Sequence, residues 1–144
     1  MGKMETYQDL EVWKQTKDLV RLVYEITKNF PREEQYGLTS QIRRAAVSIP
    51  TNIAEGCGRN HTKDSIQFFF VSRGSLYEVE TQIFIARDLD FISTEEQGIT
   101  ISRIKSCKRL LNGFINYFQS RGNQQLSTIN EQLIEYGNNN EESH

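Results

Sequence analysis

The 144-residue sequence contains few residues that break helices and few that hold small folds together. Its two prolines leave room for long uninterrupted helices. Two cysteines, Cys57 and Cys107, provide no disulfide framework and fit a reducing compartment. No apolar run exceeds the four residues found at 68–71, and a membrane-spanning helix needs about 20 apolar residues. No signal peptide is recognisable, so we expect a cytoplasmic protein with one domain-sized core.

Strong charge of one sign is also absent, because the formal net charge is −2. The charge is nevertheless unevenly distributed along the chain. Residues 122–144 contain Glu131, Glu135, Glu141 and Glu142 and no Lys or Arg, whereas residues 97–121 contain five basic residues and no acidic one. The chain is therefore not a generally basic nucleic-acid-binding protein, but it has one basic element followed by an acidic tail.

Apolar residues recur at three- and four-residue steps over four segments, which predicts four helices at residues 9–30, 39–55, 62–90 and 93–120. We expect Asp9, Thr39 or Ser40, Thr62 and Ser93 to cap them, Ser93 in a capping box with Glu96. Short connections predict an all-α, up-down-up-down antiparallel four-helix bundle over residues 1–122. The polar tail, residues 123–144, contains Leu126, Ile129, Leu133 and Ile134 at helical spacing, so a short helix could precede a disordered end.

The second helix contains Pro50 near its middle, which predicts a kink because proline cannot donate to the carbonyl of Ala46. Ala45, Ala46 and Gly74 are small enough to allow close helix contacts. Gly56-Cys57-Gly58 favours a helix stop over an anion site. The third helix is apolar on most of its circumference, and this surplus predicts self-association.

Residues for catalysis and metal binding are scarce. The two histidines, His61 and His144, cannot build the two Glu-x-x-His motifs of a di-iron bundle. Cys57 and His61 have a metal-like spacing, but no second pair completes four ligands. No Ser/His/acid arrangement and no phosphate-binding fingerprint accompanies them. We therefore expect no enzyme activity, no bound metal and no cofactor.

The basic element lies on the predicted fourth helix. Cations could contact phosphates there, with Tyr117 stacking on an unpaired base, and the alternative is an ordinary solvated helix face. The residues that we predict to bind nucleic acid are Arg103, Lys105, Lys108, Arg109 and Arg121.

Two blocks resemble the signature of a known family. They are residues 41–59, Gln-Ile-Arg-Arg-Ala-Ala-Val-Ser-Ile-Pro-Thr-Asn-Ile-Ala-Glu-Gly-Cys-Gly-Arg, and residues 74–82, Gly-Ser-Leu-Tyr-Glu-Val-Glu-Thr-Gln. Both resemble the four-helix-bundle proteins encoded in intervening sequences of bacterial 23S ribosomal RNA genes, as does the opening Asp9-Leu10-Glu11-Val12-Trp13. The resemblance covers about residues 7–120.

The resemblance implies a bacterial, cytosolic, all-α protein without established catalytic activity. The family is related to the accessory variability protein of diversity-generating retroelements, a pentameric basic barrel that works with a reverse transcriptase and nucleic acid. By similarity we expect a homopentamer. The ribosomal name records where the genes lie and does not establish a ribosome-associated role.

The signature residues have two interpretations, a structural or interface role and direct contact with a ligand. A polar network among them is one prediction, in which Glu78 and Glu80 pair with arginines of the second helix. The set comprises Arg43, Arg44, Pro50, Asn52, Glu55, Gly74, Tyr77, Glu78 and Glu80.

Together these observations favour a non-enzymatic, oligomeric RNA-binding protein, in which a ring repeats a weak basic patch and gains affinity through avidity. The alternative is a protein-interaction scaffold that does not bind nucleic acid. For the first interpretation the expected partner is RNA or an RNA-handling protein, and for the alternative it is an acidic protein surface; neither involves a membrane.

Overall fold

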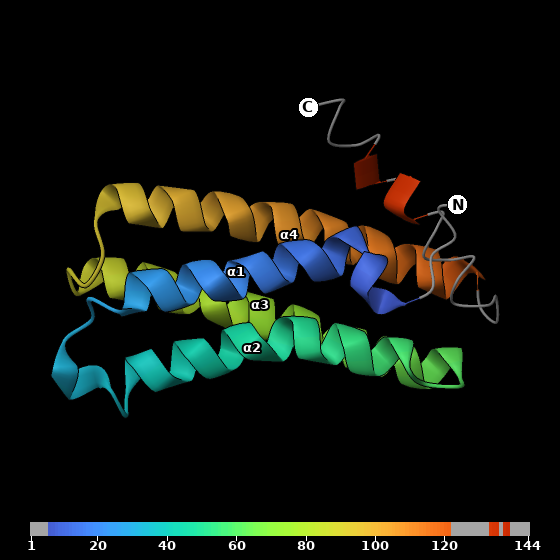
Figure 1. Cartoon of the computed structure of the whole chain (residues 1–144), viewed down its shortest axis with the longest axis horizontal. Coiled ribbons are helices and arrows are strands. Elements are labelled where there is room, and N and C mark those ends of the chain that lie inside the picture. Colours follow the sequence, from blue (N-terminus) through green and yellow to red (C-terminus); the bar gives the residue numbers. More distant parts are fainter. Residues whose placement is uncertain (1–5, 122–132, 136, 139–144) are drawn as a thin grey trace.

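The computed structural model describes residues 6–121, 133–135 and 137–138. These residues form four long helices: α1 (Glu11–Thr27), α2 (Leu38–Cys57), α3 (Thr62–Asp88) and α4 (Thr94–Arg121). Two 3-10 turns, η1 (Tyr7–Asp9) and η2 (Arg32–Glu34), precede α1 and α2. The helices run along one common axis, each antiparallel to the next (Figure 1). The predicted all-α antiparallel bundle is confirmed.

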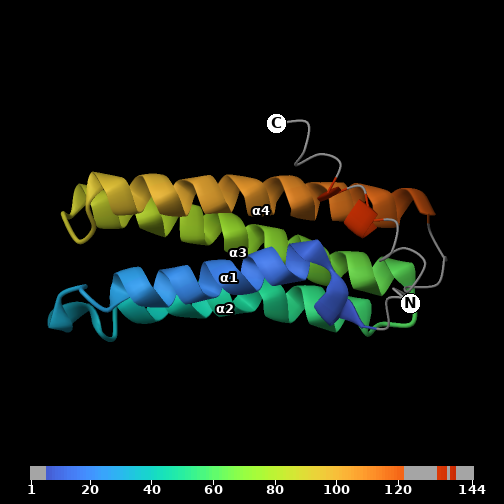
Figure 2. The ribbon, with the colours of Figure 1, turned by 45° about the horizontal axis from the view of Figure 1, so that its top comes forward.

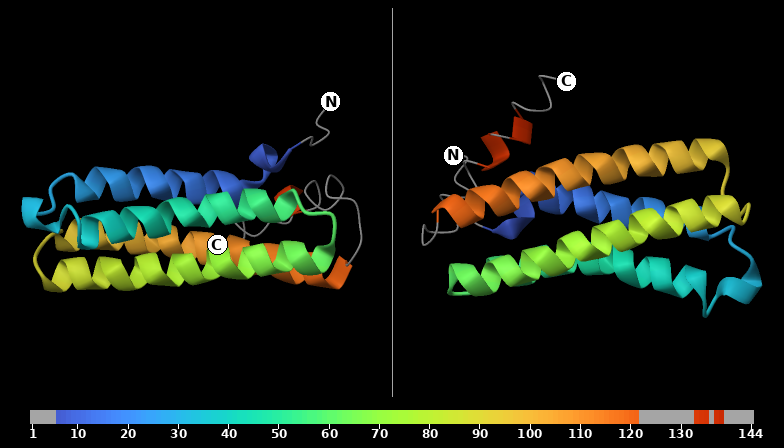
Figure 3. Two further views of the ribbon diagram at one scale, coloured as in Figure 1. Left: turned by 90° about the horizontal axis from the view of Figure 1, so that it is seen from below. Right: turned by 180° about the vertical axis from the view of Figure 1, so that it is seen from behind.

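Each helix packs against two neighbours. α2 lies between α1 and α3, and α4 closes the bundle by contacting α3 and α1. Figure 2 shows the α1–α2 pair beside the α3–α4 pair, and both views of Figure 3 show the same arrangement from other sides. Each helix therefore keeps one side free for the surroundings. No helix in the described part of the chain is long and apolar enough to cross a membrane.

The first two helices begin at residues that the sequence did not identify. Asp9 lies in η1, and the N-cap of α1 is Leu10, because the turn directs this buried leucine into the core. α1 ends at Thr27, before the predicted Phe30. α2 begins at Leu38, where the carboxylate of Glu34 accepts the Leu38 amide proton at 2.9 Å. A carboxylate from the preceding turn thus replaces the predicted Thr39 or Ser40 cap.

The C-terminal end of α3 and the start of α4 follow standard capping chemistry, whereas the N-cap of α3 makes no side-chain capping hydrogen bond. His61, not Thr62, is the N-cap of α3. After Asp88 the amide of Phe91 donates to the carbonyl of Ala86 at 2.8 Å, and Asp90 adopts a φ of 61°, as in a Schellman motif. The predicted capping box is confirmed, since Ser93 and Glu96 exchange hydrogen bonds of 2.9 and 3.0 Å.

α2 continues through Pro50, which is buried, and its ribbon is bowed in Figure 1. Three successive carbonyls beside the proline accept side-chain hydrogen bonds. Thr51 donates to Val47 at 2.7 Å, Asn52 to Ser48 at 2.8 Å, and Ser72 of α3 to Ile49 at 2.8 Å. Such back-bonding bends helices and satisfies polar groups near a proline. Asn52 therefore has a structural role in α2.

The centre of the core is aromatic. Phe69 of α3 packs edge-on against Phe114 and Phe118 of α4, with ring centroids 4.6 and 5.2 Å apart. Beyond α4, Leu133 is buried in the same hydrophobic core and Ile134 packs against it. The predictions for Leu126 and Ile129, and most of those for residues 123–144, lie outside the described residues.

Candidate functional site

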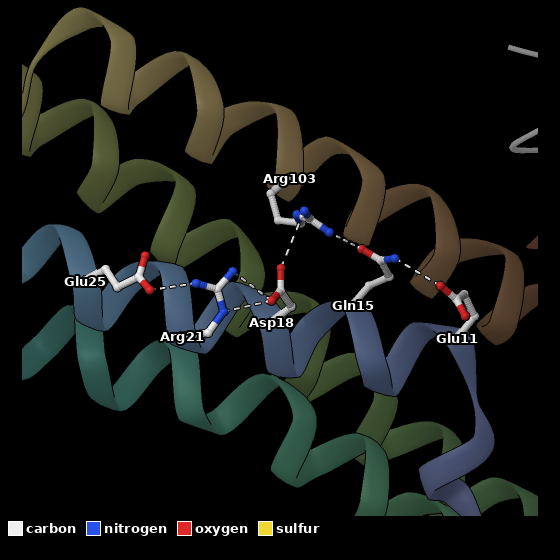
Figure 4. Close-up of polar contacts among 6 residues, drawn as sticks. All are labelled: Glu11, Gln15, Asp18, Arg21, Glu25 and Arg103. Carbon is white, nitrogen blue, oxygen red and sulfur yellow. Dashed lines mark hydrogen bonds and ion pairs between the residues drawn. The ribbon is translucent and has the colours of Figure 1, made fainter.

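The basic residues of α4 do not form one free stripe. Arg103 points toward α1, where its guanidinium donates to the side-chain oxygen of Gln15 and lies 3.4 Å from the carboxylate of Asp18. Figure 4 shows this contact as the junction of a polar chain along α1. Asp18 also binds Arg21 at 2.9 Å. The charge of Arg103 is therefore balanced within the bundle.

Lys108 turns the other way, toward α3. Its ammonium group lies 2.7 Å from both carboxylate oxygens of Glu80 and 4.4 Å from the ring centroid of Tyr77. The two charged side chains are only 22% and 19% exposed. Partial burial and two partners make Lys108 a connection between α3 and α4, with little of its charge left for RNA.

Two of the predicted nucleic-acid-binding residues are free. Lys105 and Arg109 are exposed one turn apart on the outer side of α4, and neither makes an ion pair with another described residue. Arg109 also borders a small hollow with Leu10, Phe114 and Leu133. Arg121 is the last residue of α4, and its side chain lies outside the described part.

The assignment of Lys108 to the fold gives a stability prediction. Lys108→Met leaves Glu80 partly buried without its cation, so we expect the free energy of unfolding to fall by about 1–2 kcal/mol. The double variant Glu80→Gln with Lys108→Met recovers most of that loss, because neither charge is then unpaired. Urea denaturation at one protomer concentration measures both. Equal stability of wild type and Lys108→Met would contradict the assignment.

The predicted pairing of Glu78 and Glu80 with arginines of α2 is wrong for Glu80 and for Arg43, because each of them has a different partner. Arg43 donates to the hydroxyl of Thr27 at 2.8 Å and stacks on Tyr24 at 4.6 Å, so it ties α2 to α1. Glu80 binds Lys108 of α4. Sequence spacing could not identify these partners, because they lie on helices distant in the chain. No ion pair joins Arg44 to another described residue, although Arg44 and Glu78 border the same hollow.

The two signature glycines have roles different from those predicted. A Cβ built on Gly74 would meet nothing within 4 Å, so the predicted close helix contact at Gly74 is wrong within the subunit. A Cβ on Gly56 would lie 2.5 Å from the Phe69 ring and 2.9 Å from the Ser65 carbonyl oxygen. The crossing of α2 and α3 therefore depends on Gly56, which the sequence had indicated only as part of a helix stop. Glu55 remains exposed, 3.9 Å from Arg59.

An open groove follows the outer side of α2, and the sequence analysis did not identify it as a unit. Arg43, Arg44 and Asn52 of the signature lie along it together with side chains that carry hydroxyl groups. Ser48 in its floor exchanges a hydrogen bond of 2.9 Å with Ser75 of α3. The "α2 groove" is lined by Tyr24, Gln35, Thr39, Ser40, Arg43, Arg44, Val47, Ser48, Thr51 and Asn52.

Such a groove can donate hydrogen bonds to a negatively charged partner. Arg44 supplies an exposed guanidinium, and next to it the guanidinium of Arg43 stacks on the ring of Tyr24. Guanidinium groups bind carboxylates and phosphates through two parallel hydrogen bonds. Of the polar features in the described residues, the α2 groove therefore fits an anionic partner better than α4 does.

The outer side of α3 exposes several large apolar side chains among polar ones such as Glu78, Thr81 and Asp88. Val71, Phe84 and Ile85 are 54%, 47% and 41% exposed, and Tyr77 is 48% exposed. Large apolar side chains that gather on one exposed helix face typically mark an interaction surface. This observation fits the surplus of apolar residues in the sequence.

The described residues contain no group of three or more His, Cys, Asp or Glu side chains that could hold a metal ion. Both cysteines are buried, and this burial raises the pKa of the Cys57 and Cys107 thiols to about 12. At neutral pH they are protonated thiols, and the thiolate is the form that binds metals and attacks electrophiles.

The comparisons with known proteins agree with this fold. A family model described as "23S rRNA-intervening sequence protein" matches residues 8–113. A solved structure from Bacteroides thetaiotaomicron, described as a protein of unknown function from the S23 ribosomal protein family, is similar with a TM-score of 0.64 at 21% sequence identity. That likeness covers 72% of this chain and 97% of the other, and it shows the fold alone. A search of curated proteins found no match.

Proposed function

The chain belongs to the 23S rRNA-intervening sequence protein family, and we propose that it acts as a non-enzymatic binding protein assembled from several identical copies. The exposed apolar side of α3 is the observation that supports this proposal most strongly. About half of the surface of Phe84 and Ile85 is exposed to water in an isolated subunit. Burying this apolar surface against a second protein surface would be energetically favourable. The resemblance described above favours five copies in the bacterial cytoplasm.

The chemistry of the described residues supports a scaffold role. The buried thiols are protonated, and the polar residues of the signature blocks hold helices together or line an open groove. Repeating that groove around an assembly would turn a weak contact into strong binding through avidity.

Substitution of Phe84 tests the assembly. Phe84→Glu places a charge on the outer side of α3, so we expect a smaller particle in sedimentation velocity and little change in melting temperature. Tyr36→Glu is the control, because Tyr36 is 89% exposed in the α1–α2 connection, far from α3 along the fold. The proposal fails if wild type and Phe84→Glu sediment identically.

RNA is the second candidate, as the partner of the assembled protein. The exposed Arg44, with Arg43, Tyr24 and several hydroxyl groups beside it, favours this partner. These are the side chains that contact phosphates and stack on unpaired bases. We propose the α2 groove, more than α4, as the RNA-binding surface.

Binding of labelled structured RNA across a salt series tests this candidate. We expect affinity to fall steeply with salt, with a slope that estimates the number of phosphates contacted. Arg44→Glu should weaken binding about tenfold or more, whereas Lys105→Glu with Arg109→Glu, compared at protein concentrations at which both variants sediment like the wild-type particle, should change it less. The reverse order would place RNA on α4. Absence of binding at low salt would remove RNA and leave the protein scaffold.

A further inference from the structure

We propose that the copies meet head to tail, with the outer side of α3 in one subunit packed against the outer side of α4 in the next. This inference rests on the proposed assembly and assigns its contact surfaces. Three independent features support it: side chains that need cover on α3, a hollow that can receive them on α4, and opposite charges at matching positions.

The outer side of α3 presents a regular seam. Its exposed residues recur at three- and four-residue steps, the spacing of helices that pack side by side along their length. None of these seam residues is basic. The seam comprises Val71, Gly74, Glu78, Thr81, Ile85 and Asp88, flanked by Tyr77 and Phe84.

Gly74 within this seam is not explained by the subunit alone. A glycine in a helix interior weakens the helix by about 1 kcal/mol relative to alanine, and here an alanine methyl group would touch nothing within the chain. A neighbouring molecule that approaches the helix backbone closely would explain why this position has no side chain.

The outer side of α4 provides a matching surface. Three small residues, Gly98, Ser102 and Ser106, make an open hollow there, and Ile99 and Arg103, on its α1 side, also line it. Ile99 is 54% exposed beside it, and a Cβ on Gly98 would meet nothing within 4 Å. An apolar side chain such as Ile85 of the next copy would fit this hollow and cover Ile99.

Charge and spacing agree with one register. Lys105 and Arg109 are the exposed cations of α4, and Glu78 is the exposed carboxylate in the middle of the α3 seam. Seven residues separate Glu78 from Ile85 and seven separate Lys105 from Gly98, about 10.5 Å along each helix, and residues seven apart lie on one face of a helix. With the helices antiparallel, Glu78 faces Lys105 while Ile85 faces Gly98, and Ile99 lies to one side of it.

The same register explains Gly74. Four residues separate Gly74 from Glu78, and four separate Arg109 from Lys105, so Arg109 of one copy lies over Gly74 of the next. The bare backbone leaves room for the long arginine stem. The basic face of α4 that suggested RNA binding is thus used in assembly.

Two different surfaces make the contact heterologous, and such contacts form rings when the rotation closes. α3 and α4 are neighbouring helices of the bundle, so their outer sides meet at roughly a right angle. Contact faces at that angle favour closure into a small ring over growth of a straight filament.

Disulfide trapping tests the pairing. Ile85→Cys and Gly98→Cys are made in separate chains with different tags, so that a link between them must join two molecules. After co-expression and mild oxidation we expect the 85–98 dimer on non-reducing gels, with little 85–85 or 98–98 dimer. Wild type is the background control, because its buried, protonated cysteines should not react.

Exchange of the charges of Glu78 and Lys105 is a second test. Both residues are exposed, so the substitutions should leave the fold intact. Glu78→Lys and Lys105→Glu should each raise the concentration at which the assembly dissociates, by about tenfold, and the double variant should restore it. Lys14→Glu, an exposed charge change on α1, is the matched control.

The outcomes separate the two proposals. A particle with several subunits that yields 85–85 links, or no 85–98 link, overturns the α3–α4 pairing and leaves the proposed assembly standing. A wild-type particle of one subunit overturns both. Failure of the double charge variant to recover also contradicts the pairing.

Discussion

Phe69→Ala is expected to lower the free energy of unfolding by about 3–5 kcal/mol. The side chain is fully buried and makes edge-on contacts with Phe114 and Phe118, so its removal leaves a cavity between α3 and α4 and also breaks two aromatic contacts. Urea denaturation followed by circular dichroism measures the change. Wild type and variant are compared at one protomer concentration, because assembly contributes to apparent stability.

Phe68→Ala is the matched control for this prediction. Phe68 is the adjacent residue on α3, but its ring is only partly buried and lies under the guanidinium of Arg59 at 4.4 Å. We expect a loss of about 1 kcal/mol from the partial burial and the cation–π contact. Losses of equal size for the two variants would show that Phe69 is not at the centre of the core.

Alanine at the two signature glycines is expected to act in opposite directions. Gly56→Ala forces a methyl group to within 2.5 Å of the Phe69 ring and 2.9 Å of the Ser65 backbone oxygen. Backbone cannot yield as a flexible side chain does, and Phe69 is held on its other side by two rings. We expect a loss of about 1–3 kcal/mol from overpacking.

Gly74→Ala should instead stabilise the isolated subunit by about 1 kcal/mol, because it adds helix propensity where nothing is near. The proposed assembly contact at the same position should weaken, since the added methyl group displaces the arginine stem above it. Unfolding measured well below the dissociation concentration separates the two effects. A loss of subunit stability in Gly74→Ala would contradict this account of α3.

The sequence predicted the four helices and their order because each has an apolar face with a helical period. It predicted their ends less well, since several caps come from residues outside the simple pattern. The carboxylate of Glu34 accepts the first amide proton of α2, and the buried Leu10 is the N-cap of α1. The Ser93–Glu96 capping box was predictable because both of its partners lie within four residues.

The candidate surfaces were harder to predict. Helical spacing placed Arg103 and Lys108 on the polar side of one helix, but it could not show that Asp18 and Glu80 lie opposite them on other helices. The contrast between Gly56 and Gly74 has the same cause. Whether a glycine can be replaced by a larger residue depends on its distance to a neighbouring helix, and only the packing of the helices sets that distance.

The mass of the wild-type particle tests the central claim, which is that the open side of α3 is covered by another copy. Native mass spectrometry at micromolar protomer concentration measures it directly. The account predicts a whole multiple of the 16.8 kDa chain, with five copies favoured. A single species of 16.8 kDa under those conditions would contradict it.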